Sequence, residues 1–140
     1  MVDPRSHVST MDLMAVEVAA ATTDANGRLV INATATVYTQ SFMLPRATSM
    51  GVEYRLYSGG TIDVDVSIEV GNVRPTTEGS ADTENYGVAT AIETGVNDQV
   101  LHVKAPAPTV NKYARFKLQG QGSNAATTAI EVLMFHWENN

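Results

Sequence analysis

The side chains of this sequence that could do chemistry are few, and their spacing matches no catalytic motif. It contains no Gly-x-Ser-x-Gly, Gly-x-x-x-x-Gly-Lys or His-Glu-x-x-His pattern, the signatures of a nucleophile elbow, a phosphate-binding loop and a zinc-protease helix. The three histidines, His7, His102 and His136, lie far apart in unlike contexts. Isolated histidines without ligand spacing are usually structural or solvated. We therefore predict a protein that is not an enzyme and holds no metal or cofactor.

A row of acidic residues, Asp63, Asp65 and Glu69, is the best candidate for a metal site, because calcium binds several carboxylate oxygens. An EF-hand loop that begins at Asp63 needs glycine at position 68 and glutamate at position 74. The sequence has Ile68 and Arg74 there. The calcium motif is therefore rejected, and we interpret the row as the solvated face of a strand.

The acidic row belongs to the clearest structural signal of the chain, a predicted β-hairpin between Gly51 and Val70. Apolar residues take every second position on both sides of Gly59-Gly60, which puts them on one face of each pleated strand. The glycine pair could supply the positive φ of a tight turn. The acidic row then lies on the other face, where Arg115 and Lys117 of another strand could oppose it with about 0.2 to 1 kcal/mol per pair.

Further segments of alternating or apolar residues, separated by turn residues, predict about seven strands and no helix. These segments are residues 14–20, 28–39, 101–105, 113–118 and 127–137. The segment 14–20 is rich in alanine and also allows a helix. The pattern is typical of an all-β fold, and we predict one antiparallel β-sandwich or jelly-roll-like domain over residues 13–140.

The last predicted strand is apolar on both faces. One face carries Ile130, Val132 and Met134, and the other carries Leu133, Phe135 and Trp137. A strand that is apolar on both faces is covered on both faces. We expect a loop or a neighbouring subunit to form the second cover, and we expect Trp137 to lie in the core or at an interface.

The first twelve residues are polar, contain Pro4 and show no period, so we predict an extended N-terminal arm over residues 1–12. Such an arm becomes ordered when another molecule holds it. Val2, Val8 and Met11 could fill small pockets on that molecule, while Pro4 keeps the chain extended. We therefore expect these four residues at an interface.

A second unusual segment runs from Gly71 to Gln99, where the alternation stops. Loops of more than about 15 residues are uncommon inside compact domains and are usually functional or disordered. We predict that this segment lies at a subunit contact and that Arg74 and Tyr86 take part in it.

Composition narrows the classes of function. Nucleic-acid backbones are bound by clustered lysine and arginine, so a formal charge of −6 argues against a nucleic-acid partner. Without cysteine, neither a disulfide framework nor a thiolate metal site can form. No window approaches the roughly 18 apolar residues of a membrane span, and the first ten residues lack the apolar core of a signal peptide. We expect no membrane partner and a protein that is soluble where it is made.

Three stretches resemble small virion structural proteins of tailed bacteriophages: residues 41–47 (SFMLPRA), the predicted hairpin through residues 71–75 (GNVRP), and residues 112–120 (KYARFKLQG). These are the decoration or cement proteins on the outside of the capsid lattice, and the likeness spans roughly residues 41–120. The resemblance implies a β-sandwich or β-tulip-like body, often a homotrimer at three-fold positions, with an arm that reaches over the shell. It also implies the major capsid protein or another virion protein as partner, and assembly on the capsid exterior in the host cytoplasm.

Two functions of different classes therefore follow from the sequence. The first is a virion structural protein that binds only the assembled shell and so stabilises it by mass action. The alternative is a carbohydrate-binding or adhesion module, because many such modules are β-sandwiches of this size. Sugar binding favours exposed aromatic platforms, whereas Tyr54 and Tyr57 point to opposite faces of one predicted strand.

Overall fold

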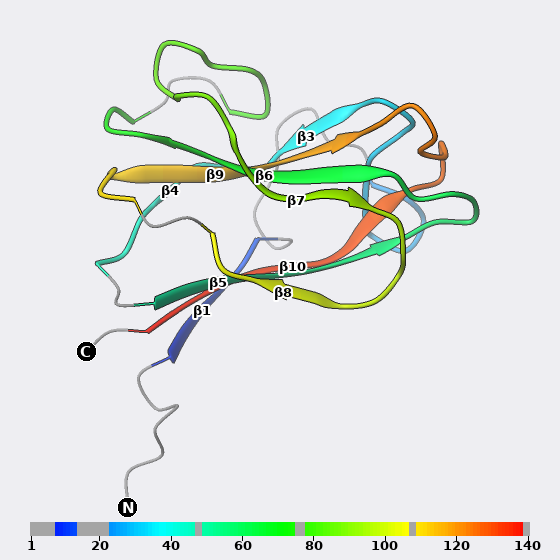
Figure 1. Ribbon diagram of the computed structural model, residues 1–140, viewed down its shortest axis with the longest axis horizontal. Helices are drawn as coiled ribbons and strands as arrows, with labels where there is room; N and C mark the ends of the chain where they lie inside the picture. Colours follow the sequence, from blue (N-terminus) through cyan, green and yellow to red (C-terminus); the bar gives the residue numbers. More distant parts are fainter. Residues whose placement is uncertain (1–7, 14–22, 47–48, 75–77, 107–108, 139–140) are drawn as a thin grey trace, which may run out of the picture.

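The computed structural model of the protein describes residues 8–13, 23–46, 49–74, 78–106 and 109–138. These ranges contain ten β-strands and no helix, so they also contain no helix that could cross a membrane. The strands form two five-stranded antiparallel sheets that face each other (Figure 1). The prediction of an antiparallel β-sandwich is confirmed.

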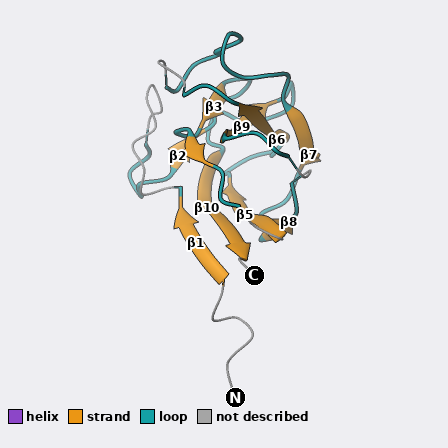
Figure 2. Ribbon diagram, turned by 90° about the vertical axis from the view of Figure 1, so that its left-hand side faces the viewer, coloured by secondary structure: helices purple, strands orange, loops and turns teal. Residues whose placement is uncertain are grey.

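Each sheet is built around one of the last two strands of the chain. In the β10 sheet the order is β1-β10-β5-β8, and β2 also pairs with β10; the bounds are β1 (Val8–Asp12), β2 (Leu29–Val30), β5 (Ser49–Tyr57), β8 (His102–Lys104) and β10 (Ala129–Glu138). In the β9 sheet the order is β3-β9-β6-β7, and β4 also pairs with β9; the bounds are β3 (Thr36–Tyr38), β4 (Phe42–Met43), β6 (Val64–Gly71), β7 (Thr90–Val96) and β9 (Tyr113–Gly120). Figure 2 shows the two layers from the side.

The core lies between the two sheets and consists of the inward residues that the alternation predicts. Val52, Tyr54 and Leu56 of β5 are buried, as are Val64 and its alternate neighbours on β6. Phe42, Phe116 and Phe135 meet in the centre, with ring centroids 5.1 to 6.0 Å apart. Burying each large apolar side chain stabilises the fold by about 1.5 to 3 kcal/mol.

The predicted hairpin between Gly51 and Val70 is wrong, although both of its strands form. β5 pairs with β10 and β8, whereas β6 pairs with β9 and β7, so the connection crosses from one sheet to the other. Gly59 and Gly60 do not adopt positive φ. Instead, Gly60 N donates to Ser58 Oγ (3.1 Å) and Gly59 N donates to Thr127 Oγ1 (3.1 Å). Alternation determines which face of a strand is buried and leaves its partner strand open.

A bulge in β10 explains why this strand is apolar on both faces. Ile130 is opposite Leu56 and Val132 is opposite Arg55, so Glu131 is one extra residue on its side of the ladder. After the extra residue the alternation changes phase, and Leu133 joins Ile130 in the core. Val132 is half-buried on the outer face. The predicted grouping of Ile130 with Val132 on one face is therefore wrong.

The predicted N-terminal arm extends too far into the chain. Residues 8–12 form β1, an edge strand that pairs with β10 from Val8↔Glu138 to Asp12↔Met134. Met11 is half-buried and packs against the core. The edge of β10 offers free backbone groups, which pair with any extended segment regardless of its side-chain pattern. Within the described residues, the sheet begins at Val8. Val2, Pro4 and the predicted segment 14–20 lie outside the described residues.

Two other predicted segments are subdivided by the fold. Residues 28–39 form β2 in one sheet and β3 in the other, with Ala33 between them at a φ of 48°. The predicted loop over residues 71–99 contains β7, which pairs with the outer side of β6. The predicted opposition of the acidic row and the basic residues of β9 is confirmed only for Glu69, which is directly opposite Arg115. Lys117 is opposite Ser67, and Asp65 is opposite Gln119.

Candidate functional site

The structure does not gather the histidines and acidic residues into one site. Within the described ranges, no three histidine, aspartate or glutamate side chains are placed to hold a metal ion. His7 lies outside these ranges. His136 is on the outer face of the β10 sheet, where its Nε2 lies 3.0 Å from Glu53 Oε1 and its Nδ1 lies 2.9 Å from Thr10 Oγ1. A neutral imidazole satisfies both contacts, with Nε2–H donating to Glu53 and Nδ1 accepting from Thr10.

His102 connects the two sheets at the side of the sandwich where β7 and β8 are the edge strands. Its ring stacks on Tyr54, with centroids 5.4 Å apart and planes 1° apart. Its Nδ1 lies 3.1 Å from Glu93 Oε2 on β7, and its Nε2 lies 2.7 Å from Asp98 Oδ1. Both ring nitrogens therefore face carboxylates, and only the imidazolium donates to both of them.

The groups around His102 are electrostatically coupled. The hydrogen bond from His102 lowers the pKa of Asp98 below its usual range. Tyr54 Oη donates to the same Glu93 carboxylate. Burial is the main cause of a strongly raised pKa for Tyr54, and the Glu93 carboxylate adds to it. The cluster connects β5, β7 and β8 at this side of the sandwich.

Arg115 is the largest fully buried side chain, although it points outward from the β9 sheet. Its Nε lies 2.8 Å from Glu69 Oε1, and its guanidinium carbon lies 4.0 Å from the centre of the Tyr38 ring and 4.4 Å from that of Tyr86. Among the described residues, its Nη1 and Nη2 have no hydrogen-bond partner. The guanidinium is held by one carboxylate and two aromatic faces.

Tyr86 comes from the segment that we predicted at a subunit contact. It is 4% exposed, and burial raises the pKa of its hydroxyl. Gly87 N donates to Val70 O (3.1 Å), and a Cβ added to Gly71 would lie 1.9 Å from the carbonyl oxygen of Asn85. This part of the segment therefore packs on its own domain, which corrects the prediction that Tyr86 faces a partner.

The other predicted interface residues are placed as follows. Arg74 is exposed. Trp137 is half-buried, stacks on Phe135 with ring centroids 5.6 Å apart, and lines a shallow hollow of about 220 Å³ with His136 and Glu138. The backbone of Val8 is in β1, and Met11 is half-buried. Arg74 is more accessible than Met11, Tyr86 and Trp137.

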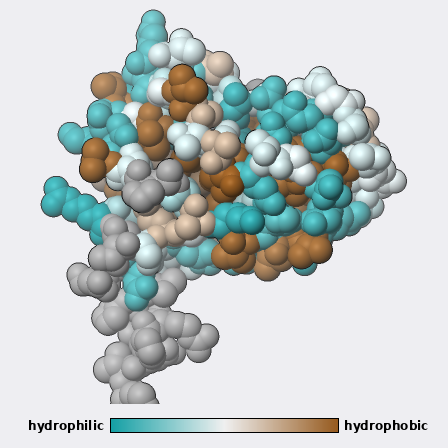
Figure 3. Space-filling model, viewed as in Figure 1, coloured by the Kyte–Doolittle hydropathy of each residue, from teal (hydrophilic) through white to brown (hydrophobic). Residues whose placement is uncertain are grey.

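The β8 patch, defined as Val100, Leu101 and Val103, is a surface that sequence reasoning did not single out. Val100 is 63% exposed and Val103 is 64% exposed. Val103 is opposite Glu53 of β5, so it points to the outer face of the β10 sheet. Figure 3 shows apolar side chains gathered on the side of the molecule where Figure 1 places β8. The signal in the sequence was the run Val100-Leu101-His102-Val103, apolar at positions 100, 101 and 103.

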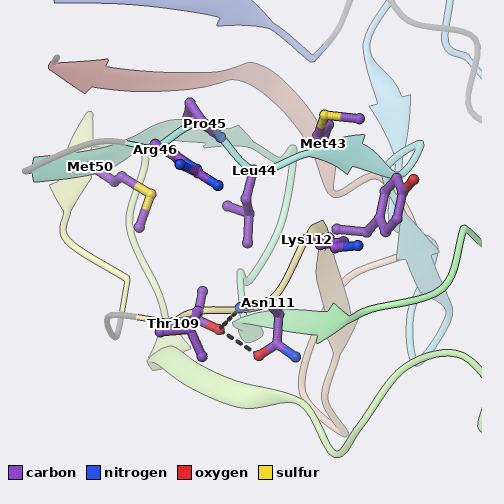
Figure 4. A pocket seen from close by; sticks show the side chains of 10 residues that line it. Met43, Leu44, Pro45, Arg46, Met50, Thr109, Asn111 and Lys112 are labelled. Carbon is purple, nitrogen blue, oxygen red and sulfur yellow. Dashed lines mark hydrogen bonds between the residues drawn. The ribbon is translucent and has the colours of Figure 1, made fainter.

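A larger hollow of about 820 Å³, here called the β4 pocket, opens at one end of the sandwich. It is lined by residues 43–46 and Met50 on one side and by residues 109–113 on the other. In Figure 4, Leu44, Arg46 and Met50 extend toward Thr109 and Asn111. Thr109 Oγ1 donates to Asn111 Oδ1 (2.6 Å) and accepts from the backbone N of Asn111 (3.1 Å).

Aromatic side chains do not form an exposed platform. The chain has one tryptophan, five tyrosines and three phenylalanines, and all of them fall in the described ranges. Each is buried or half-buried. Tyr57 is half-buried beneath the guanidinium of Arg28, whose carbon lies 3.8 Å from the ring centre.

No protein-family model matches this sequence, and neither does any curated protein. Among the solved structures that the chain is similar to is one described as a low-affinity xylan-binding module, CBM86, from the gut symbiont Roseburia intestinalis. The identity is 14%, the alignment covers 95% of this chain and 96% of the other, and the TM-score is 0.49. The two-sheet architecture described above stands on the strand pairings of this chain itself.

Proposed function

We propose that this chain is a non-catalytic structural subunit that binds other protein subunits through the β8 patch. The observation that carries the proposal is an exposed apolar row on and beside an edge strand. Exposed sheet edges bind other chains unless charges, proline or a covering segment protect them. Along this edge the described protection consists of Lys104, Pro106 and the pair of Asp98 and His102, and it leaves Val100 and Val103 exposed. Apolar side chains of this kind form the buried centre of protein interfaces.

The partners that fit best are further copies of this chain and the surface of a viral shell. This is the role of a capsid decoration protein, which the resemblance of residues 41–120 implies, and a homotrimer is the expected assembly. The net charge of −6 supports a protein partner rather than a nucleic acid, because a negatively charged chain repels the nucleic-acid backbone. Such a subunit acts by burying area on assembly, so it needs no reactive group.

Sedimentation velocity tests the proposal. The wild-type chain should form an oligomer whose dissociation constant rises at least tenfold in Val103→Glu, because a carboxylate cannot be buried unpaired at an interface. Val88→Glu is the matched control, since Val88 is 94% exposed outside the patch. An antibody against the chain should also label the outside of intact phage particles. A wild-type chain that stays monomeric and also fails to bind particles would refute the proposal.

The second candidate is the carbohydrate-binding or adhesion module. One observation favours it: Trp137, which is half-buried, lines a shallow hollow of about 220 Å³. Retardation in gels that contain soluble polysaccharides tests this directly. Under this function, Trp137→Ala should abolish retardation and Val103→Glu should leave it unchanged. Under the first proposal, neither the wild-type chain nor the variants are retarded.

A further inference from the structure

The β4 pocket differs from the rest of the surface in charge. The chain has nine lysine and arginine residues against fifteen aspartate and glutamate residues. Two of the nine, Arg46 and Lys112, line this one pocket, and no carboxylate lines it. Within the part of the chain that the structure describes, neither cation has a carboxylate within ion-pair distance. In contrast, Arg28, Arg55 and Arg115 are all paired.

The remaining wall of the pocket is mostly apolar. Met43, Leu44, Pro45, Met50 and Val110 line it, together with the aromatic Tyr113. Met43 is 68% exposed and the side chain of Val110 is fully exposed, so the wall is open to solvent. The hydroxyl of Thr109 donates to Asn111 Oδ1 (2.6 Å), and Leu44 N donates to Lys112 O (2.7 Å). The groups that distinguish this pocket are therefore its two cations beside a mostly apolar wall.

These groups determine the chemistry of the ligand. A volume of about 820 Å³ lies within the range of about 300 to 1,000 Å³ that is typical of small-molecule sites. A neutral sugar would use the Tyr113 ring and the Asn111 amide, but it would leave both cations unused. A nucleic acid needs a row of cations and gains nothing from a mostly apolar wall. An anionic group on an apolar body uses both the cations and the wall.

We propose that the β4 pocket binds an aliphatic carboxylate. The planar guanidinium of Arg46 holds the carboxylate through paired N–H donors, as arginine does for this group in general, and Lys112 supplies a second positive charge. The alkyl chain lies against Leu44 and Met50. Both cations are exposed to solvent, so their contribution is screened by salt, and the affinity should fall as ionic strength rises.

Isothermal titration calorimetry with decanoate tests the proposal. Decanoate should bind one to one, and decyltrimethylammonium and acetate should bind at least tenfold more weakly, because each lacks one of the two features. The double variant Arg46→Gln/Lys112→Gln should weaken decanoate binding at least tenfold. The matched control Lys104→Gln/Lys117→Gln removes two cations outside the pocket and should leave decanoate binding unchanged. Leu44→Ser should weaken decanoate binding and leave the affinity for acetate unchanged.

Three outcomes would overturn the proposal. The first is equal binding of decanoate and decyltrimethylammonium, which would show unspecific adsorption. The second is unchanged decanoate affinity in Arg46→Gln/Lys112→Gln, with folding of the variant verified by circular dichroism. The third is binding of an acidic, leucine-rich peptide without binding of decanoate, which would make the pocket a protein-docking site. Val103→Glu should keep full decanoate affinity, so this inference and the β8 patch fail or succeed separately.

Discussion

Replacing Arg115 by methionine should destabilise the domain by about 0.5 to 3 kcal/mol. Methionine keeps the volume and the apolar stem of arginine, so the substitution removes the charge rather than the packing. It deletes the bond to Glu69, which is worth about 1.5 to 3 kcal/mol, and the contacts with Tyr38 and Tyr86, about 1 to 2 kcal/mol together. It also removes two buried Nη groups without partners, which returns about 2 kcal/mol of their desolvation penalty.

Glu69→Gln should be at least as harmful, because it leaves the fully buried guanidinium without its carboxylate, a situation that typically costs about 3 to 5 kcal/mol. The double variant Arg115→Met/Glu69→Gln should lose less than the sum of the two single changes. We expect an interaction energy of about 2 kcal/mol in the double-mutant cycle, since the two side chains touch.

Urea unfolding followed by tryptophan fluorescence measures these differences. Lys117→Met is the matched control, because Lys117 is the next outward residue of β9 and its Nζ lies 6.0 Å from the centre of the Tyr38 ring. It should change stability by less than about 0.5 kcal/mol. Amide exchange of residues 78–87 should accelerate in Arg115→Met and not in Lys117→Met. Strict additivity in the cycle, or a loss in Lys117→Met as large as that in Arg115→Met, would refute the proposed clamp.

Three further predictions concern the backbone, the chain end and pH. Gly71→Ala should lower the thermal midpoint strongly, because the added Cβ would meet the backbone of Asn85. Gly122→Ala should leave the midpoint unchanged, because no atom lies within 4 Å of the added Cβ. Equal midpoints for the two variants would contradict the close approach at Gly71. Deleting residues 2–7 should leave the midpoint within a few degrees, and deleting residues 2–12 should lower it markedly because β1 is lost. His102 lowers the pKa of Asp98. The stability that the Asp98–His102 interaction contributes is therefore fully present above pH 3.8, the ordinary pKa of aspartate, and is lost as the pH falls through the lowered pKa. The difference in midpoint between the wild type and Asp98→Asn should therefore shrink from pH 5 to pH 2, and a constant difference would contradict this.

The sequence predicts the faces of the strands much better than their partners. Alternation along residues 52–56 and 64–68 identifies the buried side chains, because burial on one face acts on every second residue. It does not distinguish a hairpin from a crossing between sheets, since both keep the same face inward. β1 was missed because its pairing with β10 depends on backbone groups rather than on a side-chain pattern.

The functional surfaces were harder to predict because distant segments form them. Arg115 occupies an outward position of an alternating strand, which predicts a solvated side chain. It is buried only because Tyr86, from a segment that showed no period, folds over it. The β4 pocket joins residues 43–50 to residues 109–113, and the sequence does not indicate that these segments meet. Basic residues beside short apolar runs, as in Leu44-Pro45-Arg46, were the available signal.

The central positions of β9 and β10 have a consequence for how the molecule is made. β9 pairs with β3, β4 and β6, and β10 pairs with β1, β2 and β5. During synthesis, the strands before residue 113 cannot form most of their pairings until β9 or β10 has been made. The exceptions are the pairing of β6 with β7 and the pairing of β5 with β8. Thr10 and His136, which contact each other, are 126 residues apart. Forming such distant contacts is slow, so the nascent chain exposes its apolar strands until translation is nearly complete, and its yield in a cell should depend on chaperones that bind unfinished chains.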